Sequence, residues 1–432
     1  MRYFALVCLV IQMHAADLDG WPRWRGPFDN GVARGDAPVE FSDTKNVAWK
    51  VKIAGRGFSS PVMWGDRIYV TTAIPLAKSA LPSAQGGPRG AGGGSGSGIE
   101  HKFVVMCLSR KDGHVIWERT ARTATPHDGY HFRYGSFASN SPVTDGKRIY
   151  AFFGSRGVFV YDMDGKPLWQ KETEPLRMRP AFGEGTATVL HGDKLLLNFD
   201  QEQNSHLDVL DAATGKTIWQ VAREEESSWS APLVIDYKGR KQVIVSATKR
   251  VRSYDLETGK VKWECGGLGP NVIPAPVVLN DVVYVMSGFR DPNLMAIRLD
   301  RTGDLTGTDA VLWQSKRGIS YTASPVLHDG KLYFVSDNGM LSCLNAKTGE
   351  VYYQTRLPKP YNFKASPGAT NGRLYLSTEE GDVLVIKMGE KFEVLATNTF
   401  ADQSFISTPA IADGDIYLRS ETTLYCIRTR SE

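Results

Sequence analysis

Seven aromatic residues stand at equivalent places along the chain, each just ahead of a short β-rich run, and basic residues accompany many of them. Stacking on the rings and charge-assisted hydrogen bonds from the cations could hold an anionic or aromatic ligand, or a peptide. The rings could instead serve only to fill the mouth of a channel. The aromatic residues are Phe58, Phe137, Phe182, Trp229, Tyr321, Phe363 and Phe405, and the basic residues are Arg56, Arg133, Arg179, Arg317 and Lys364.

His127 and His131 have the spacing at which two histidines on a helix can chelate a metal ion. Pro126 and Gly129 favour a loop over a helix at this point. We therefore expect a loop that arches over the aromatic and basic residues, and no metal site. No Ser-His-Asp or Cys-His arrangement can be argued from the sequence, so nucleophilic catalysis is not indicated.

A repeated phrase indicates which elements must position these residues. Its fullest copies are V-L-D-A-A-T-G-K-T-I-W at 209–219 and S-Y-D-L-E-T-G-K-V-K-W at 253–263. Looser copies lie at 107–117, 160–169 and 343–353. Self-similarity with a period of roughly 40–50 residues is typical of radial or stacked repeat folds.

A second marker, a small residue usually followed by Pro, precedes each copy of the phrase. The segment 323–354 shows the complete unit, in which four short β-rich runs alternate with turns and Asn338-Gly339 is a hairpin signal. Each unit is therefore predicted to be a four-stranded antiparallel blade. The marker occurs at Ser60-Pro61, Ser141-Pro142, Ala231-Pro232, Ala275-Pro276, Ser324-Pro325, Ser366-Pro367 and Thr408-Pro409, with a degenerate copy at Thr186-Ala187.

The anchors of the outer strands predict eight blades. The chain ends in a third strand, 423–428, with no further Trp strand, and the Trp strand at 47–53 has no blade before it. We therefore predict an all-β, eight-bladed β-propeller over residues 47–428, closed by the N-terminal strand joining the last blade, which removes free sheet edges. The anchors, expected to pack between blades, are Trp49, Trp117, Trp169, Trp219, Trp263, Trp313, Tyr353 and Leu395.

Residues 1–16 are predicted to be a secretory signal peptide, with a positive Arg2, a short apolar core and cleavage near Ala15 and Ala16. No later stretch is long and apolar enough to span a membrane. We expect a periplasmic or secreted monomer. Of the four later cysteines, three share one third-strand position and are expected to be buried free thiols, and none has metal-ligand spacing. They are Cys107, Cys265, Cys343 and Cys426.

The charge balance and two segments outside the repeat complete the organisation. Lys and Arg total 51 against 47 Asp and Glu, without a concentrated basic run, which disfavours nucleic-acid binding. Residues 17–46 form an N-terminal arm that is too aromatic for a free linker and is expected to pack on the propeller, the alternative being docking of a partner. Residues 78–100 are rich in Gly, Ser and Pro and are predicted to be a disordered insertion in the first blade.

The repeats resemble the tryptophan-docking motif A-x-D-x-x-T-G-K-x-x-W of the propeller family named for pyrroloquinoline quinone (PQQ). That family contains quinoprotein alcohol and glucose dehydrogenases. It also contains non-enzymatic members, notably the lipoprotein scaffold of the outer-membrane β-barrel assembly machine. The opening Trp-Pro-x-x-Arg-Gly and the segment 288–294 resemble exported bacterial proteins described only as PQQ-like repeat proteins.

Resemblance to the dehydrogenase branch would imply PQQ over the central channel, Ca²⁺ held by Glu and Asn side chains, and an Asp as base. The alcohol dehydrogenases also place a pair of adjacent cysteines on one face of the quinone, and this chain has no adjacent cysteines. The nearest candidate Ca²⁺ ligands are Asp200, Glu202 and Asn204, and Asp291 could act as the base. The alternative is that the three ligands form an ordinary solvated loop.

We therefore expect a non-enzymatic binding or scaffold propeller without a cofactor, which recognises a protein or a small anionic ligand. The alternative is a PQQ-dependent alcohol or sugar dehydrogenase with a simplified site that holds PQQ and Ca²⁺. Fourth-to-first and second-to-third loops share one face of a propeller, so the recognition site is expected to be a funnel on that face. The funnel residues are Arg56, Phe58, His127, His131, Arg133, Trp229, Arg290, Tyr321 and Lys364.

Overall fold

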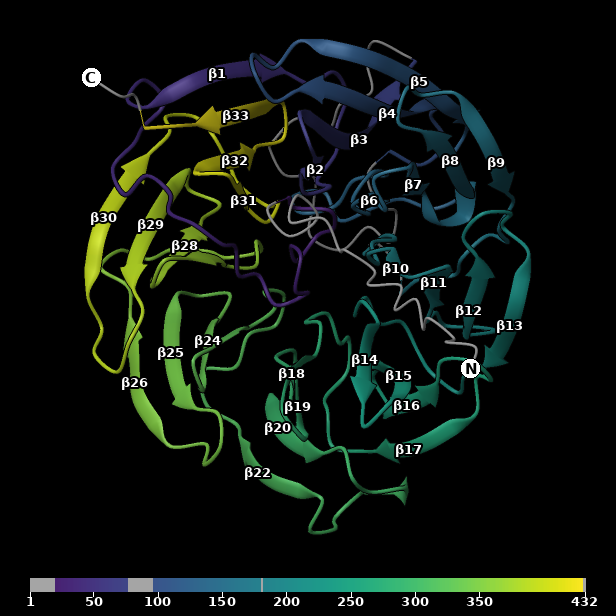
Figure 1. Cartoon of the computed structure of the whole chain (residues 1–432), viewed down its shortest axis with the longest axis vertical. Coiled ribbons are helices and arrows are strands. Elements are labelled where there is room, and N and C mark those ends of the chain that lie inside the picture. The colour runs from purple at the N-terminus through teal and green to yellow at the C-terminus, as the bar shows by residue number, and fades with distance from the viewer. Residues whose placement is uncertain (1–19, 77–95, 180–181, 430–432) are drawn as a thin grey trace, which may run out of the picture.

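The computed structural model describes residues 20–76, 96–179 and 182–429. Their strands form eight antiparallel sheets arranged as blades in a ring, and Figure 1 looks down the axis of that ring. The one helix among the described residues is the short 3-10 turn η1 (Gly154–Arg156). The predicted all-β, eight-bladed fold is confirmed. The predicted signal peptide and residues 78–95 of the predicted insertion lie outside the described residues.

The first four blades follow one another along the chain. Blade 1 consists of β2 (Val62–Trp64), β3 (Arg67–Pro75), β4 (His101–Ser109) and β5 (Val115–Ala124). Blade 2 consists of β6 (Val143–Thr144), β7 (Arg148–Phe152), β8 (Val158–Asp162) and β9 (Pro167–Lys171). Blade 3 consists of β10 (Val189–His191), β11 (Lys194–Phe199), β12 (His206–Asp211) and β13 (Thr217–Ala222). Blade 4 consists of β14 (Leu233–Tyr237), β15 (Arg240–Val245), β16 (Val251–Asp255) and β17 (Val261–Cys265), to which β21 (Gly303–Asp304) adds a parallel strand.

The remaining blades repeat the pattern. Blade 5 consists of β18 (Val277–Leu279), β19 (Val282–Ser287), β20 (Asn293–Arg298) and β22 (Val311–Ser315). Blade 6 consists of β23 (Val326–His328), β24 (Lys331–Val335), β25 (Met340–Asn345) and β26 (Val351–Arg356). Blade 7 consists of β27 (Gly368–Thr370), β28 (Arg373–Ser377), β29 (Asp382–Lys387) and β30 (Val394–Thr399). Blade 8 consists of β31 (Ala410–Ala412), β32 (Asp415–Arg419), β33 (Thr423–Ile427) and β1 (Val47–Lys52).

The two ends of the propeller meet in blade 8. Strand β1 pairs antiparallel with β33, with Trp49 opposite Cys426, and Figure 1 shows purple β1 outside yellow β33. The N-terminal strand thus supplies the outer strand that the last blade lacks, as the sequence predicts.

The repeated Trp residues pack each blade onto the next. The indole N–H of Trp117 donates to Met163 O at 2.9 Å, and that of Trp219 donates to Leu256 O at 2.9 Å. The indole ring of Trp219 lies on the Thr-Gly turn of the following blade, where a Cβ on Gly259 would come within 2.9 Å of it. That glycine also has a φ of 69°, which L side chains rarely adopt, so the turn favours Gly for two reasons. The repeated phrase therefore encodes contacts between blades as well as turns.

The small-residue-Pro marker forms hydrogen bonds around the centre of the ring. The backbone N–H of one marker residue donates to the hydroxyl of the next, through Ser324, Ser366, Thr408, Ser60 and Ser141 in turn. One of these bonds, from Thr408 N to Ser60 Oγ at 3.0 Å, joins the last blade to the first. In blades 3, 4 and 5 the residues at the equivalent position, two before each first strand, are Ala187, Ala231 and Ala275, which have no hydroxyl. One side of the centre is therefore polar and the other more apolar.

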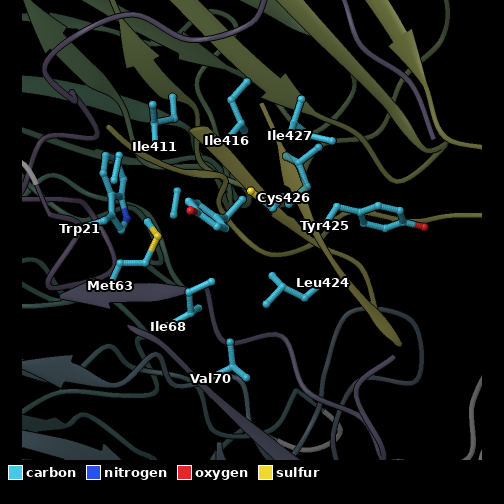
Figure 2. Close-up of a cluster of buried hydrophobic side chains, with 14 of the residues drawn as sticks. Trp21, Met63, Ile68, Val70, Ile411, Ile416, Leu424, Tyr425, Cys426 and Ile427 are labelled. Atoms are coloured by element: carbon cyan, nitrogen blue, oxygen red, sulfur yellow. The ribbon is translucent and has the colours of Figure 1, made fainter. Parts of the chain in front are cut away.

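The described N-terminal arm lies across the inner ends of five blades. Trp21 is fully buried and forms a bridge with Met63 of blade 1, within the apolar cluster between blades 8 and 1 that Figure 2 shows. Pro22 O accepts from Thr144 N of blade 2, and Trp24 Nε1 donates to Thr408 Oγ1 at 2.9 Å. Arg25 is buried and donates to Pro367 O at 3.1 Å and to a carbonyl oxygen of blade 6. The arm thus belongs to the folded unit, as expected from its aromatic residues.

Candidate functional site

A central cavity of about 550 Å³ opens among the loops that join the blades. Its walls come from connections between fourth and first strands, from the second-to-third connection of blade 5, and from the arm. Polar lining residues include Ser60, Ser141, Glu184, Lys364, Ser366 and Thr408. The aromatic lining residues are Trp24, Phe58, His131, Tyr134, Phe182, Trp229, Phe289 and Tyr321.

Five of the nine funnel residues line this cavity, namely Phe58, His131, Trp229, Tyr321 and Lys364. The rings are held in fixed places by one another and by the backbone. Trp229 Nε1 donates to Gly183 O at 2.9 Å, and its ring lies 5.9 Å from that of Phe182. The ring of Tyr321 lies 5.1 Å from that of Phe289. The aromatic walls are therefore preorganised for stacking.

Arg56 does not line the cavity. Its buried guanidinium donates to three loop carbonyls, those of Phe132 at 2.9 Å, Gly135 at 3.1 Å and Arg133 at 3.2 Å. It also lies over the rings of Phe58 and Tyr130 at 5.2 and 5.3 Å. Arg56 therefore supports the loop between β5 and β6 and presents no free cation to a ligand.

The two histidines of that loop do not converge. His127 lies within 2.8 Å of Leu176 O, while His131 stacks on Tyr134 at 4.3 Å with an interplanar angle of 7°. Burial lowers the pKa of His131, and the positive charges of Lys364, Arg133 and Arg56 lower it further. Residues 126–135 form turns and irregular structure, as predicted. Within the described ranges, no three His, Cys, Asp or Glu side chains are grouped so as to hold a metal ion.

Cations and carboxylates alternate at the edge of the cavity. Lys364 is paired with Asp337 and lies over the ring of Tyr134 at 4.5 Å. Arg133 Nη2 lies 3.2 Å from Glu379 Oε2, and the second Glu379 oxygen lies 3.9 Å from Lys364 Nζ. Burial raises the pKa of Glu379, while Lys364 and Arg133 lower it. The four charges balance one another, so a bound anion would compete with carboxylates already present.

Arg290 and Asp291 stand outside the lining. The Arg290 guanidinium lies over the ring of Phe289 at 5.3 Å, and its φ is 44°. Asp291 is exposed and forms an ion pair with Lys316 at 3.2 Å. A general base is expected to face the reacting group in a sheltered site, and an exposed, ion-paired Asp291 lacks that setting.

The candidate Ca²⁺ ligands do not fit a calcium ion. Both oxygens of Asp200 already accept hydrogen bonds, from two nitrogens of Arg223 and from Ser228 and Asn198. The Asp200 and Arg223 side chains are completely inaccessible to solvent. Ca²⁺ requires six to eight oxygen ligands, and an Asp occupied by four donors has no lone pair to spare. Asp200 therefore belongs to the packing of blade 3.

Trp24, Tyr134, Glu184 and Phe289 line the cavity but are missing from the sequence-based funnel. Tyr134 and Phe289 adjoin residues that the sequence analysis selected, so proximity along the chain could have found them. Trp24 enters from the arm, and the Trp-Pro-x-x-Arg-Gly segment is the signal that could have pointed to it. Glu184 is held by Ser155 and by Arg156 at 2.8 Å, contacts between blades that no local pattern predicts.

The fold defines an eight-bladed propeller with a cavity at its centre. A family model described as outer membrane protein assembly factor BamB matches residues 101–207, 203–306 and 298–391, and the chain belongs to that family.

Two solved structures show the same fold. BamB from Moraxella catarrhalis is 16% identical with a TM-score of 0.54, over 84% of this chain and 99% of its own. Quinohemoprotein alcohol dehydrogenase from Comamonas testosteroni is 12% identical with a TM-score of 0.65, over 98% of this chain and 82% of its own.

A curated relative matches over a shorter stretch. Tetrathionate hydrolase from Acidianus ambivalens is 28% identical over 116 residues, which is 23% of this chain and 22% of the hydrolase. The match thus spans about a fifth of that relative's length. None of the helices in the described part of this chain has the length and apolar character needed to cross a bilayer.

Proposed function

We propose that this chain is an exported binding module whose central cavity holds a planar, negatively charged organic group. The group is either a free small ligand or part of a protein partner. One observation carries the proposal: eight aromatic side chains and Lys364 line a cavity of about 550 Å³. That volume is in the range of roughly 300–1,000 Å³ that is typical of small-molecule sites.

The chemistry of the lining supports a planar ligand. Trp229, Phe182, Phe289 and Tyr321 offer ring faces and edges against which a flat group can stack. The hydroxyls of Ser141, Ser366 and Thr408 lie on the more polar side and can bind oxygen atoms of the ligand. Lys364 is the cation of the lining, and the exposed guanidinium of Arg133 lies near it.

Export and a recognition role are supported by separate observations. The predicted signal peptide favours transport out of the cytoplasm, and the family to which the chain belongs is described as an outer membrane assembly factor. A dehydrogenase is less well supported, because Asp200 is occupied by Arg223 and Asp291 is exposed and ion-paired. We therefore favour recognition over redox catalysis.

The test uses 8-anilinonaphthalene-1-sulfonate, an anion with a planar naphthalene ring that fluoresces in apolar sites, and N-phenyl-1-naphthylamine as its neutral counterpart. We expect one dye to bind per chain, with the anion preferred. Trp229→Ala should weaken binding about tenfold, since loss of one stacking partner costs about 1–3 kcal/mol. Phe28→Ala is the matched control, because Phe28 is an exposed aromatic outside the cavity lining.

Two further experiments distinguish the possible sources of the ligand and test the alternative function. Pull-down from a periplasmic extract, with and without competing dye, distinguishes a protein partner from a free small molecule. Titration with PQQ, with and without Ca²⁺, is followed by a dye-linked oxidation assay with alcohols and sugars. Absence of dye binding, or binding unchanged in Trp229→Ala, would overturn the cavity assignment. Calcium-dependent PQQ binding with turnover would make the chain an enzyme.

A further inference from the structure

The segment Tyr130–Ser136, here called the strap, extends from the junction of blades 1 and 2 toward blades 6 and 7. His131, Tyr134 and Gly135 of the strap line the central cavity, so the strap forms part of its wall. At its far end, Tyr134 meets Lys364 of the connection from blade 6 to blade 7. Arg133 meets Glu379 of the second-to-third connection of blade 7. The strap thus bridges elements separated by three blades around the ring. The side of the cavity that carries Lys364 and Glu379 is here called the far wall.

The backbone of the strap from Phe132 to Gly135 is firmly held. Arg56 binds three of its carbonyl oxygens, and Gly135 N donates to His131 O at 2.7 Å to close a turn. Tyr130 is buried, and a Cβ on Gly183 would come within 2.9 Å of it. Movement of the strap would therefore preserve its turn and its attachment to Arg56.

The side chains at the tip are held much less firmly than this backbone. The Arg133 side chain is 56% exposed, and Phe132 beside it is 45% exposed. The tip is joined to the far wall by one ion pair, from Arg133 to Glu379, and by the cation-ring contact between Lys364 and Tyr134. The Arg133 end of the ion pair is exposed, so its guanidinium can exchange Glu379 for water at small cost. The buried carboxylate of Glu379 then needs another partner.

The far wall has an unmet hydrogen-bonding need. The Glu379 side chain is only 7% exposed, and its Oε1 is buried without a hydrogen-bond partner among the described residues. Lys364 Nζ is 3.9 Å from that oxygen and is directed to Asp337 instead. The closed arrangement is thus poorly satisfied at this carboxylate, and an unsatisfied buried group favours alternatives in which it is paired or hydrated.

We propose that the strap is a gate over the central cavity, latched by Arg133 to Glu379 and by Tyr134 to Lys364, and that an anionic ligand enters by replacing Glu379 as the partner of Arg133. This inference rests on the proposed function for the identity of the ligand, but the movement of the strap does not. An open strap exposes the aromatic wall, and a closed strap covers the bound group with His131 and Tyr134. Arg56 is the positioning residue for this movement.

Hydrogen exchange of the strap amides tests the gate without any ligand. Arg133→Gln and Glu379→Gln each remove the ion pair, and each should speed exchange in a peptide covering 130–136 about fivefold, the effect expected for a weak ion pair. Arg301→Gln is the matched control, because Arg301 is also partly exposed and paired with acidic residues, Asp300 and Asp309, outside the cavity. Circular dichroism establishes that each variant is folded, and Arg133→Gln, at an exposed site, is the safer of the two.

Stopped-flow mixing with 8-anilinonaphthalene-1-sulfonate gives the second readout. Glu379→Gln, which frees Arg133, should raise the association rate constant of the dye by about threefold or more. Arg133→Gln, which removes the partner of the incoming anion, should raise its dissociation rate constant and weaken binding by a similar factor. Strap exchange unchanged in both folded variants would overturn the gate, whatever the dye does. Dye that binds no variant would overturn the proposed function, while the exchange result would still decide the gate.

Discussion

Arg223 Nε lies 2.6 Å from Asp200 Oδ1, and neither side chain is accessible to solvent. The guanidinium also donates to the hydroxyl of Tyr254, so the pair joins blade 3 to blade 4. Ser228 supplies a further donor to Asp200 at 2.7 Å. This satisfied network explains why a carboxylate with the right sequence position for a metal ligand is a structural residue instead.

Removing one member of this pair should be costly. Asp200→Ala leaves Arg223 as a buried, uncompensated charge, and we expect the free energy of unfolding to fall by about 3–5 kcal/mol. Urea denaturation followed by tryptophan fluorescence measures the change. Glu202→Ala, two residues away and exposed, should change it by less than about 0.5 kcal/mol.

A calcium titration tests the alternative role of Asp200 as a metal ligand. If Asp200 were a ligand, millimolar Ca²⁺ would raise the Tm of the native protein, and Asp200→Ala would abolish that rise. We expect neither effect. A calcium-dependent Tm lost in the variant would restore the metal hypothesis for Asp200.

The anchors between blades give a second prediction. Trp219→Ala removes the indole that rests on Gly259 and donates to Leu256 O, and should lower the free energy of unfolding by about 3–5 kcal/mol. In the outer strand of blade 7 the position opposite Val385, which matches Trp219 opposite Val209, holds Ala396, so the predicted anchor Leu395 is wrong. Leu395→Ala is the comparison, because this neighbouring side chain is 37% exposed and should matter much less. Equal losses in the two variants would contradict the packing role of the repeated Trp.

The cysteines give a third prediction. Burial raises the pKa of Cys107 and Cys426 to about 12, and that of Cys265 and Cys343 to about 11. Since only the thiolate reacts, none of these four thiols should react with a disulfide reagent at neutral pH while the protein is folded. Protein beginning at Asp17 should release about four equivalents of reagent in guanidinium chloride. A fast-reacting thiol in the native protein would contradict their burial.

The blades could be predicted from the sequence because their determinants are local and repeated. The Thr-Gly turn and the Trp four residues later specify both the hairpin and the contact to the next blade, so each copy confirms the others. The hydrogen bonds from the backbone of one marker to the hydroxyl of the next, which involve Ser60, Ser141 and Ser366, form only when the blades close into a ring. The marker itself is visible in the sequence.

The site could be predicted only in part, because its remaining residues depend on contacts distant in the chain. Phe58 and Tyr321 follow from their place before a first strand. Arg56 has the same signal, but carbonyls 76 to 79 residues further along bind its guanidinium. Asp200 likewise finds Arg223 in a later strand. Type and spacing select residues near the site, and long-range partners decide which of them are free to bind.

His131 of the strap and Glu379 of the far wall should change the stability of the folded protein with pH in opposite directions. Burial, with Lys364, Arg133 and Arg56, lowers the pKa of His131 below 6.5, so the unfolded chain binds a proton here before the folded protein does. Stability from His131 is therefore full above about pH 6.5 and is lost as the pH falls. NMR titration of the His131 ring should give a midpoint below 6.5, and a midpoint above that value would contradict its burial.

Glu379 should change the pH dependence of stability in the opposite direction. Burial raises the pKa of Glu379 above 4.5. The charges of Lys364 and Arg133 lower this pKa, and those of Glu380 and Asp337 raise it. As the pH falls, the folded protein therefore takes up this proton before the unfolded chain does. Its contribution to stability therefore grows as the pH falls toward 4.5. Between about pH 7 and pH 5, His131→Gln should lessen the fall in Tm and Glu379→Gln should increase it. Arg301→Gln is the control, and a matching response in all three variants would show that neither group titrates as the closed strap requires.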